Sequence, residues 1–251
     1  MVVVTGAGRG LGRAIALRYA RERCFIVAID VDSAGFEGLK QDIETAGAQA
    51  LCLECDVANE SEVMKCCTRI LASVPKVDIL ICNAGVAQEK YFEDLSSLQF
   101  RHTIEVNFFG VVHLIRFFPE SQFPRQIVVV SSVLAFDTTI RVSEYSASKA
   151  ALHVFLTALR LENSQKGRNV YITEVCPWHI DTKMFQSWKL RWGLFPPLSV
   201  EYVSNALFEA VCRRKSIVVL PWYQWYVFAL FQQLPMSLHD WLALHLLAQT
   251  L

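Results

Sequence analysis

The chain alternates short runs of β-branched, apolar residues with longer stretches of helical length. The short runs lie at 2–4, 25–29, 50–54, 78–82, 126–131, 170–175 and 216–220. The stretches between them lie at 11–23, 34–46, 60–73, 97–118, 144–163 and 200–213. Short buried strands separated by helices are typical of repeated βαβ units with right-handed crossovers. The pattern therefore predicts an α/β fold of one domain, a doubly wound parallel sheet of about seven strands with helices on both faces and ligands at the carboxyl ends of the strands.

Composition limits the classes of protein to which the chain can belong. Hydrophobic residues make up 53% of the 251 residues, a content too high for a disordered chain. The 24 basic and 24 acidic side chains give a formal net charge of zero, without long runs of like charge. A nucleic-acid partner is not expected, because such a partner needs clustered Lys and Arg. No linker, repeat or low-complexity segment divides the chain.

Eight cysteines are scattered along the chain, and two of them, Cys52 and Cys55, form a C-x-x-C pair. Zinc sites use such pairs. The second pair here, however, is the adjacent Cys66 and Cys67, and the first lies in an apolar strand-like run. We therefore expect no metal, and we interpret the cysteines as small buried hydrophobic residues in a reducing compartment.

A glycine-rich segment, TGAGRGLG, lies between the first predicted strand and the first predicted helix. Its spacing is G-x-x-x-G-x-G from Gly6 through Gly10 to Gly12, rather than G-x-G-x-x-G. Glycines are needed where the backbone turns sharply and lets a pyrophosphate approach the free N–H groups of a helix N-terminus. A flexible turn without a ligand is the alternative. The position between strand and helix favours dinucleotide binding, with Arg9 and Leu11 beside the glycines.

Asp30 closes the second predicted strand, 18 residues beyond Gly12. A carboxylate at this place accepts hydrogen bonds from the adenosine ribose hydroxyls and repels a 2′-phosphate, which favours NAD over NADP. Asp32 competes for the same role, and Arg9 could instead meet a 2′-phosphate. Because the Asp30 carboxylate opposes that phosphate directly, we predict NAD as the cofactor and NADP as the alternative.

Further motifs follow in a fixed order. They are Asp56-Val57 after the third strand, Asn83-Ala84-Gly85 after the fourth, a Val-Asn pair ending at Asn107, serines at 131 and 132, and Tyr145-x-x-x-Lys149. Together with T-G-x-x-x-G-x-G at 5–12, this order and spacing resembles the short-chain dehydrogenase/reductase superfamily from residue 2 to about residue 220. The resemblance implies a Rossmann fold and an oxidoreductase that uses NAD or NADP to interconvert an alcohol and its carbonyl compound.

Tyr145 and Lys149 lie one turn apart on a predicted helix and share a face. A free tyrosine has a pKa near 10, and a nearby ammonium together with an oxidised nicotinamide is expected to lower that pKa. The resemblance assigns Tyr145 as the acid/base, and Lys149 as its modulator and a donor to the nicotinamide ribose. It assigns Ser132 to polarise the substrate oxygen, with Ser131 as the alternative. It also assigns Asn107 to hold a proton-relaying water, unless this amide only satisfies backbone groups.

The other expected cofactor contacts also rest on the resemblance. It places Asp56, Val57, Ala84 and Gly85 beside the cofactor at strand ends, with Asn83 shaping the end of its strand. Thr182 is placed at the nicotinamide carboxamide, although Pro177-Trp178 stands where the family usually has Pro-Gly.

Four stretches outside these motifs are similar to one branch of the superfamily, the retinal reductases, epidermal retinol dehydrogenases and lipid-droplet hydroxysteroid dehydrogenases. They are SVLAF (132–136), TKMFQ (182–186), LFPPL (194–198) and VVLPW (218–222). The branch implies a lipophilic substrate, with retinol or retinal first and a steroid or fatty alcohol as the alternative. Its members usually carry an apolar anchor before the first strand, whereas this sequence opens with MVVVTG, so either the protein begins at its first strand or the sequence is truncated. A membrane or lipid-droplet scaffold without turnover is the alternative of another class.

Two segments are expected to vary between members of the superfamily. The Rossmann and catalytic domain spans 1–220, and within it residues 178–198 form a predicted substrate lid. The aromatic side chains of this lid either line the substrate site or pack the lid onto the core: Trp178, Phe185, Trp188, Trp192 and Phe195. Residues 221–251 form an apolar extension that Pro221 and Pro235 cut into pieces too short to cross a bilayer.

Tryptophan and tyrosine in this extension, with basic residues at 213–215 before it, favour contact with a membrane or lipid-droplet surface. The expected location is the cytosolic face of the endoplasmic reticulum or of a lipid droplet. A homodimer interface or a pocket cover, in a cytoplasmic protein, is the alternative.

Overall fold

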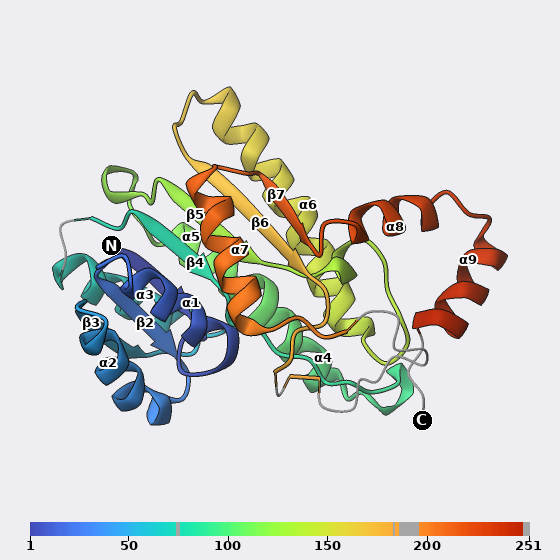
Figure 1. Ribbon diagram of the computed structural model, residues 1–251, viewed down its shortest axis with the longest axis horizontal. Helices are drawn as coiled ribbons and strands as arrows, with labels where there is room; N and C mark the ends of the chain where they lie inside the picture. The colour runs from blue at the N-terminus through green and yellow to red at the C-terminus, as the bar shows by residue number, and fades with distance from the viewer. Residues whose placement is uncertain (74–75, 183, 186–195, 248–251) are drawn as a thin grey trace.

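Seven parallel strands form one sheet in the order β3-β2-β1-β4-β5-β6-β7 (Figure 1). The strands are β1 (Val2–Thr5), β2 (Ile26–Asp30), β3 (Ala50–Glu54), β4 (Ile79–Cys82), β5 (Gln126–Val130), β6 (Tyr171–Pro177) and β7 (Ile217–Leu220). This computed structural model describes residues 1–73, 76–182, 184–185 and 196–247. The predicted doubly wound parallel sheet is confirmed. Its strand order reverses between β1 and β4, which opens a crevice at their carboxyl ends.

Helices cover both faces of the sheet. One face packs against α1 (Gly10–Ala20), α2 (Phe36–Thr45) and α7 (Val200–Cys212), and the other packs against α3 (Glu60–Ser73), α5 (Gly110–Arg116) and α6 (Ser143–Gln165). Successive residues of β1 serve opposite faces, because Val3 belongs to the second of these cores while Val2 and Val4 belong to the first. Burial on both faces explains why the strands are continuously apolar rather than alternating.

The predicted single helix over 97–118 is divided by a π-helical segment. It consists of α4 (Ser97–Ile104), a π-helix (Glu105–Phe109) and α5. The π-helix carries Asn107, which is fully buried. At the start of α5 a Cβ on Gly110 would lie 2.9 Å from Val57 Cγ2, so the helix runs close to the loop after β3. Such local widening inside helices is common at functional sites, and helical periodicity alone does not reveal it.

The chain after β7 forms α8 (Gln224–Phe231), α9 (Met236–Leu242) and a π-helical turn (Ala243–Leu247), which extend from one side of the sheet (Figure 1). Phe228 of α8 is buried in a small core that it shares with Trp178. Across the described ranges, which omit 74–75, 183, 186–195 and 248–251, no helix combines the length and apolarity needed to cross a membrane.

Candidate active site

The glycine-rich loop joins β1 to α1 through backbone contacts that exclude larger side chains. Gly6 and Gly10 have positive φ angles of 64° and 54°, a region that favours glycine. A Cβ on Gly12 would lie 1.9 Å from the carbonyl oxygen of Gly6. The side chain of Leu11 is buried in the core under α1, so at this position only the backbone remains available to a ligand.

A network of hydrogen bonds ties this loop to the end of β4. Thr5 Oγ1 accepts from the backbone N–H of Asn83 at 3.0 Å and of Ala84 at 3.1 Å. Asn83 Nδ2 donates to the carbonyl oxygens of Thr5 at 3.0 Å and Gly6 at 3.3 Å. The structure thus places Asn83 as a support of two strand ends. Thr5 is missing from the residues expected in the site, although a polar residue that closes an apolar strand before a glycine was a usable signal.

Asp30 lies at the carboxyl end of β2 beside the glycine-rich loop. Its Oδ2 accepts from the backbone N–H of Gly8 at 2.8 Å, and its Oδ1 accepts from that of Asp32 at 3.1 Å. The carboxylate of the competing Asp32 instead accepts from Ala34 N at 3.0 Å and caps a 3₁₀ turn. A small cavity of about 90 Å³ is lined by Gly8, Arg9, Asp30, Asp32 and Gly35. Both the predicted carboxylate and the opposing Arg9 therefore line the same cavity.

The other predicted cofactor residues take different positions. Asp56 Oδ1 accepts from Ala58 N at 2.9 Å, so this carboxylate stabilises a turn. Val57 is buried against the segment around Gly110. A Cβ on Gly85 would lie 3.8 Å from Lys149 Nζ, which brings the end of β4 to the catalytic helix. Thr182 Cγ2 would lie 3.7 Å from a Cβ on Gly10, and thus faces the glycine-rich loop.

The Tyr145–Lys149 pair lies on α6 over the carboxyl ends of β5 and β6. Lys149 Nζ donates to the carbonyl oxygen of Val130 at 2.9 Å and lies 5.5 Å from the centre of the Tyr145 ring. Ser132, just after β5, forms a hydrogen bond with Tyr145, and its Oγ accepts from Leu134 N at 3.1 Å. Ser131 instead lies beside Cys176, the pKa of whose thiol it acts to lower. The structure therefore places Ser132, rather than Ser131, at the tyrosine.

Burial controls the protonation of both members of the pair. It raises the pKa of Tyr145 to about 12, against a smaller opposing effect of the hydrogen bond with Ser132. It lowers the pKa of Lys149 to about 8, while nearby Cys176 and Glu174 act in the opposite direction. Without a bound cofactor, desolvation of the phenolate is the largest effect on the pKa of Tyr145. The expected lowering of that pKa by Lys149 together with an oxidised nicotinamide stays a prediction.

Asn107 connects the catalytic helix to the loop after β4. Its Oδ1 accepts from Val86 N at 2.8 Å, and its Nδ2 donates to Val86 O and Ser148 Oγ, both at 2.9 Å. Ser148 Oγ in turn donates to the carbonyl oxygen of Tyr145 at 2.6 Å. All these contacts support the alternative in which Asn107 satisfies backbone groups. Ser148, a residue that sequence reasoning missed, lies next to Lys149 in YSASK.

Apolar side chains pack against Tyr145. Tyr145 packs in a cluster with Leu134 and Val142, against which Ala87 and Phe185 lie. The Phe185 ring meets the Tyr145 ring edge-on, with 5.3 Å between their centres. Trp178, expected in the same aromatic wall, is instead buried beside Phe228, where it packs in a small core. The other predicted lid aromatics, Trp188, Trp192 and Phe195, lie outside the described residues.

The cysteines are all unpaired, and most are buried. Within the residues that the structure describes, no three His, Cys, Asp or Glu side chains gather in a way that could hold a metal ion.

Comparison with known proteins adds evolutionary evidence to this geometry. The family model for short chain dehydrogenase matches residues 1–191. The chain is 37% identical over 188 residues to "Probable oxidoreductase EphD" of Mycobacterium tuberculosis, an alignment that covers 73% of this chain and 31% of that protein. The chain therefore spans about a third of the length of that relative.

Two human proteins match over more of their length. "Short-chain dehydrogenase/reductase 3" is 30% identical over 226 residues, which covers 88% of this chain and 74% of that protein. "Epidermal retinol dehydrogenase 2" is 28% identical over 243 residues, which covers 94% of this chain and 79% of that protein. These similarities extend beyond the glycine-rich loop through the catalytic helix.

Two solved structures share the fold. A short chain dehydrogenase/reductase from Burkholderia phymatum in complex with NAD has a TM-score of 0.83 at 24% identity and covers 92% of each chain. An alcohol dehydrogenase from Thermococcus sibiricus complexed with 5-hydroxy-NADP has a TM-score of 0.77 at 22% identity, covering 87% of this chain and 94% of that one.

Proposed function

The chain belongs to the short-chain dehydrogenase family, and on that premise we propose that it is an NAD-dependent oxidoreductase that interconverts a lipophilic alcohol and its aldehyde or ketone. One observation carries the proposal: Ser132, Tyr145 and Lys149 lie together at the carboxyl ends of β5 and β6. The glycine-rich loop follows β1 and lies at the neighbouring crevice between β1 and β4, where doubly wound sheets bind dinucleotides.

The residues at this crevice fit a dinucleotide. Backbone at Gly6 and Gly12 is already in contact, so only glycine leaves room for a pyrophosphate at the start of α1. The Asp30 carboxylate lines the small cavity beside the loop, where it would accept from ribose hydroxyls and disfavour a 2′-phosphate. NAD is therefore the proposed cofactor, and Arg9 in the same cavity is the reason to test NADP beside it.

The side chains of the site have complementary roles. A bound nicotinamide would supply or accept the hydride. Tyr145 donates its proton to the carbonyl oxygen in reduction and takes a proton from the hydroxyl in oxidation. Ser132 donates a hydrogen bond to the same oxygen as negative charge develops there. The ammonium of Lys149 favours the phenolate form of Tyr145 and would hold the nicotinamide ribose.

Retinol or retinal is the proposed substrate, supported by two observations. Apolar side chains, Leu134, Val142 and Phe185 among them, surround Tyr145, and such a wall suits a long apolar molecule better than a sugar. The similarity to "Epidermal retinol dehydrogenase 2" extends over 94% of the chain. A steroid or a fatty alcohol would satisfy the same apolar wall.

The first experiment measures retinol oxidation and retinal reduction in liposomes by nicotinamide absorbance, with NAD(H) and NADP(H) in separate assays. We expect the wild-type protein to turn over with NAD(H). We expect the turnover rate of Tyr145→Phe to fall about 10²-fold or more at unchanged NADH binding, roughly the rate factor that general acid/base catalysis contributes. Turnover only with steroids or fatty alcohols would replace retinol as the substrate. Nucleotide binding without turnover of any of them would favour a scaffold role.

We also propose that the C-terminal segment from residue 221 rests on a membrane or lipid-droplet surface on the cytosolic side of the endoplasmic reticulum. Large apolar side chains there are exposed to solvent: Trp222 (70%), Tyr226 (67%), Leu230 (65%), Met236 (77%) and Trp241 (54%). Exposed apolar groups gathered in one segment indicate a binding surface, and tryptophan and tyrosine prefer membrane interfaces.

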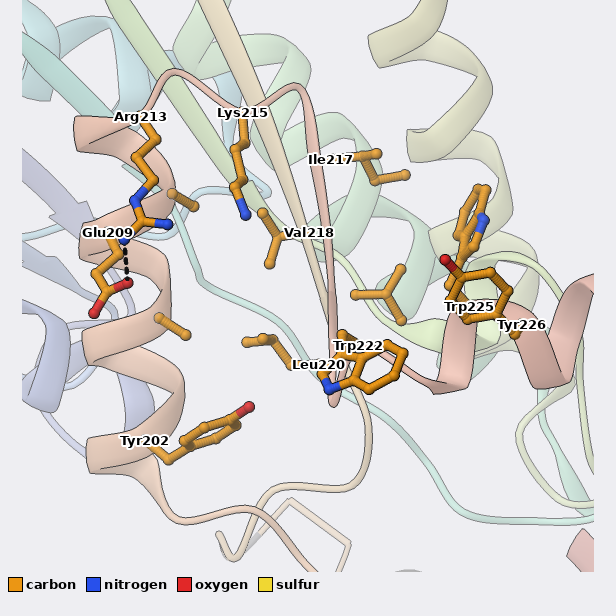
Figure 2. Close-up of a pocket in the computed structure, with 13 residues that line it drawn as sticks. Tyr202, Glu209, Arg213, Lys215, Ile217, Val218, Leu220, Trp222, Trp225 and Tyr226 are labelled. Carbon is orange, nitrogen blue, oxygen red and sulfur yellow. Dashed lines mark ion pairs between the residues drawn. The ribbon is translucent and has the colours of Figure 1, made fainter.

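A groove beside this segment supports the same surface (Figure 2). It has a volume of about 570 Å³ and lies between α7 and α8 over the free edge of β7. Trp222 and Tyr226 line it on the α8 side, while Arg213 and Lys215 line its opposite end. Basic groups next to aromatic ones suit an interface with anionic lipid headgroups.

Liposome flotation tests the membrane proposal. The triple variant Trp222→Ser, Leu230→Ser, Trp241→Ser is expected to stay with the soluble fraction, whereas wild type floats with vesicles that contain phosphatidylserine. Leu98→Ser is the matched control, because Leu98 is 79% exposed on α4, outside this segment. If wild type does not float and light scattering shows a dimer that the triple variant loses, the segment is instead a homodimer interface.

A further inference from the structure

A buried carboxylate lies behind the catalytic pair. Glu174 belongs to β6 and has no exposed surface. It faces α6, because Ile172, two residues earlier, packs in the core on the α6 side while Val175 packs on the opposite side. An ionised carboxylate without water is costly unless positive charge or hydrogen-bond donors compensate it. The position of Glu174 in the core therefore calls for specific partners.

His153 provides one such partner. Its Nδ1 lies 2.9 Å from Glu174 Oε2. An ionised carboxylate only accepts hydrogen bonds, so with Glu174 ionised the proton lies on Nδ1, which donates it. The His153 side chain is 31% exposed and meets the Phe136 ring edge-on at 4.9 Å, which fixes the imidazole from its other side. His153 thus connects a buried charge to the surface.

Lys149 lies near enough to Glu174 for the two charges to interact. It precedes His153 by one turn of α6, and its Nζ bonds to Val130 of β5, the strand next to β6. Glu174 Oε1 has no nitrogen or oxygen donor in hydrogen-bond range within the described part of the chain. Cys176 first, and then the carboxylate of Glu174, raise the pKa of Lys149 against the larger effect of burial.

The cluster contains two more titratable groups, Cys176 and Tyr145. Cys176 lies two residues after Glu174 on the same face of β6. Burial, and then the neighbouring carboxylate, hold the pKa of its thiol well above the usual value, so it stays neutral. Tyr145, one turn before Lys149, completes the set of groups that face the lysine. Among the residues that the structure describes, Glu174 is the carboxylate that acts on Lys149.

We propose that Glu174, oriented by His153, is the buried counter-charge that keeps Lys149 in its ammonium form. The proposal rests on the proposed function in that Lys149 is there the partner of Tyr145. Glu174 and His153 are then positioning residues, because they act through Lys149 without touching substrate or cofactor. In the variant Glu174→Gln, Lys149 loses its proton at a lower pH, and with it the support for the Tyr145 phenolate.

The direct test is the titration of Lys149 followed by NMR of protein labelled with ¹³Cε-lysine. The signal of Lys149 is identified by its absence from Lys149→Met. We expect its midpoint to fall by about one pH unit in Glu174→Gln, the effect of a removed charge several ångströms away in a medium of intermediate dielectric constant. This measurement needs neither substrate nor cofactor, so a failure of the proposed oxidoreductase activity leaves its outcome readable.

His153 variants give a second, graded test. His153→Phe removes the donor that orients the Glu174 carboxylate, and is expected to lower the Lys149 midpoint in the same direction. His153→Gln restores an N–H donor and is expected to return the midpoint toward the wild-type value. These two variants also decide the question if Glu174→Gln does not fold.

The control is Glu162→Gln, which removes an exposed carboxylate from the same helix and is expected to leave the titration unchanged. In turnover assays at pH 8, Glu174→Gln is expected to lose activity about fivefold, because a fall of about one unit from a pKa of about 8 lowers the charged fraction of Lys149 from about a half to about a tenth. The Glu162→Gln profile is expected to stay that of wild type. An unchanged Lys149 midpoint in a folded Glu174→Gln protein overturns the proposal, and so does a His153→Phe variant that titrates like wild type.

Discussion

Gly12 at the start of α1 touches the backbone of Gly6 at the end of β1, so closely that a Cβ on Gly12 would lie 1.9 Å from the Gly6 carbonyl oxygen. The contact brings the first turn of α1 onto the strand end and directs its N–H groups toward the crevice. Asn83 also contacts the loop here, because its Nδ2 would lie 2.6 Å from the same Cβ. The cofactor loop is therefore built by backbone packing between three segments.

Gly12→Ala is expected to destabilise the fold and abolish NADH binding, because the new methyl group meets backbone that cannot move aside. The expected loss in the free energy of unfolding is about 3 kcal/mol, at the upper end for overpacking. Urea denaturation and NADH fluorescence measure the two effects. Gly38→Ala is the control, since no atom lies within 4 Å of its added Cβ in α2, and it is expected to be neutral or stabilising. Wild-type NADH affinity in Gly12→Ala would contradict the assignment of this loop.

Asp30→Ser is expected to shift cofactor preference from NAD toward NADP. It removes the carboxylate that opposes a 2′-phosphate and leaves Arg9 in the same cavity. The ratio of kcat/KM for NAD over NADP should fall about 10- to 100-fold, the range of one or two hydrogen bonds to a charged group. Asp32→Ser is the matched variant: Asp32 caps a 3₁₀ turn through Ala34, so the change should affect stability alone. A preference shift in Asp32→Ser instead would transfer the role to that residue.

The rate of catalysis should depend on pH in opposite ways for the two directions. Reduction needs protonated Tyr145, whose pKa is about 12, and charged Lys149, whose pKa is about 8, so kcat/KM should be flat below pH 8 and fall above it. Oxidation needs the phenolate, so its rate should rise with pH and level off as Lys149 loses its proton. Initial rates from pH 6 to about pH 10 in a constant-ionic-strength buffer measure both profiles. Oxidation that is fastest in acid would be incompatible with Tyr145 as the base.

Asn107→Ala separates the two roles considered for this amide. It leaves the partly buried N–H of Val86 without its acceptor and removes the link to Ser148. If Asn107 supports the backbone, the free energy of unfolding should fall by about 3 kcal/mol, the sum of one or two unsatisfied buried groups. Urea denaturation and kcat are measured on the same preparation. Wild-type stability with a large loss of kcat would instead favour the water-holding role.

Much of the fold follows from local pattern. Continuously apolar runs of β-branched residues predict strands buried on both faces. Helices between such strands, with right-handed crossovers, predict a doubly wound parallel sheet. The glycine spacing at Gly6, Gly10 and Gly12 and the i, i+4 spacing of Tyr145 and Lys149 are equally local. For these features, neighbouring residues alone set the geometry, which is why a linear sequence predicts them.

Other features depended on which segments meet in space. Ser132 rather than Ser131 at Tyr145, the three hydrogen bonds of Asn107, and the burial of Trp178 all depend on contacts between distant parts of the chain. The raised pKa of Tyr145 is a further case, because desolvation reflects everything packed around the ring.

The sequence by itself determined the order of strands and helices, the cofactor loop and the identity of the catalytic pair. Only the tertiary structure decided the environment of that pair, including Glu174 and His153, which lie on different elements and meet at 2.9 Å. The physical reason is that backbone conformation responds to the nearest few residues. Burial, hydrogen bonding and charge compensation instead respond to neighbours that only folding brings together.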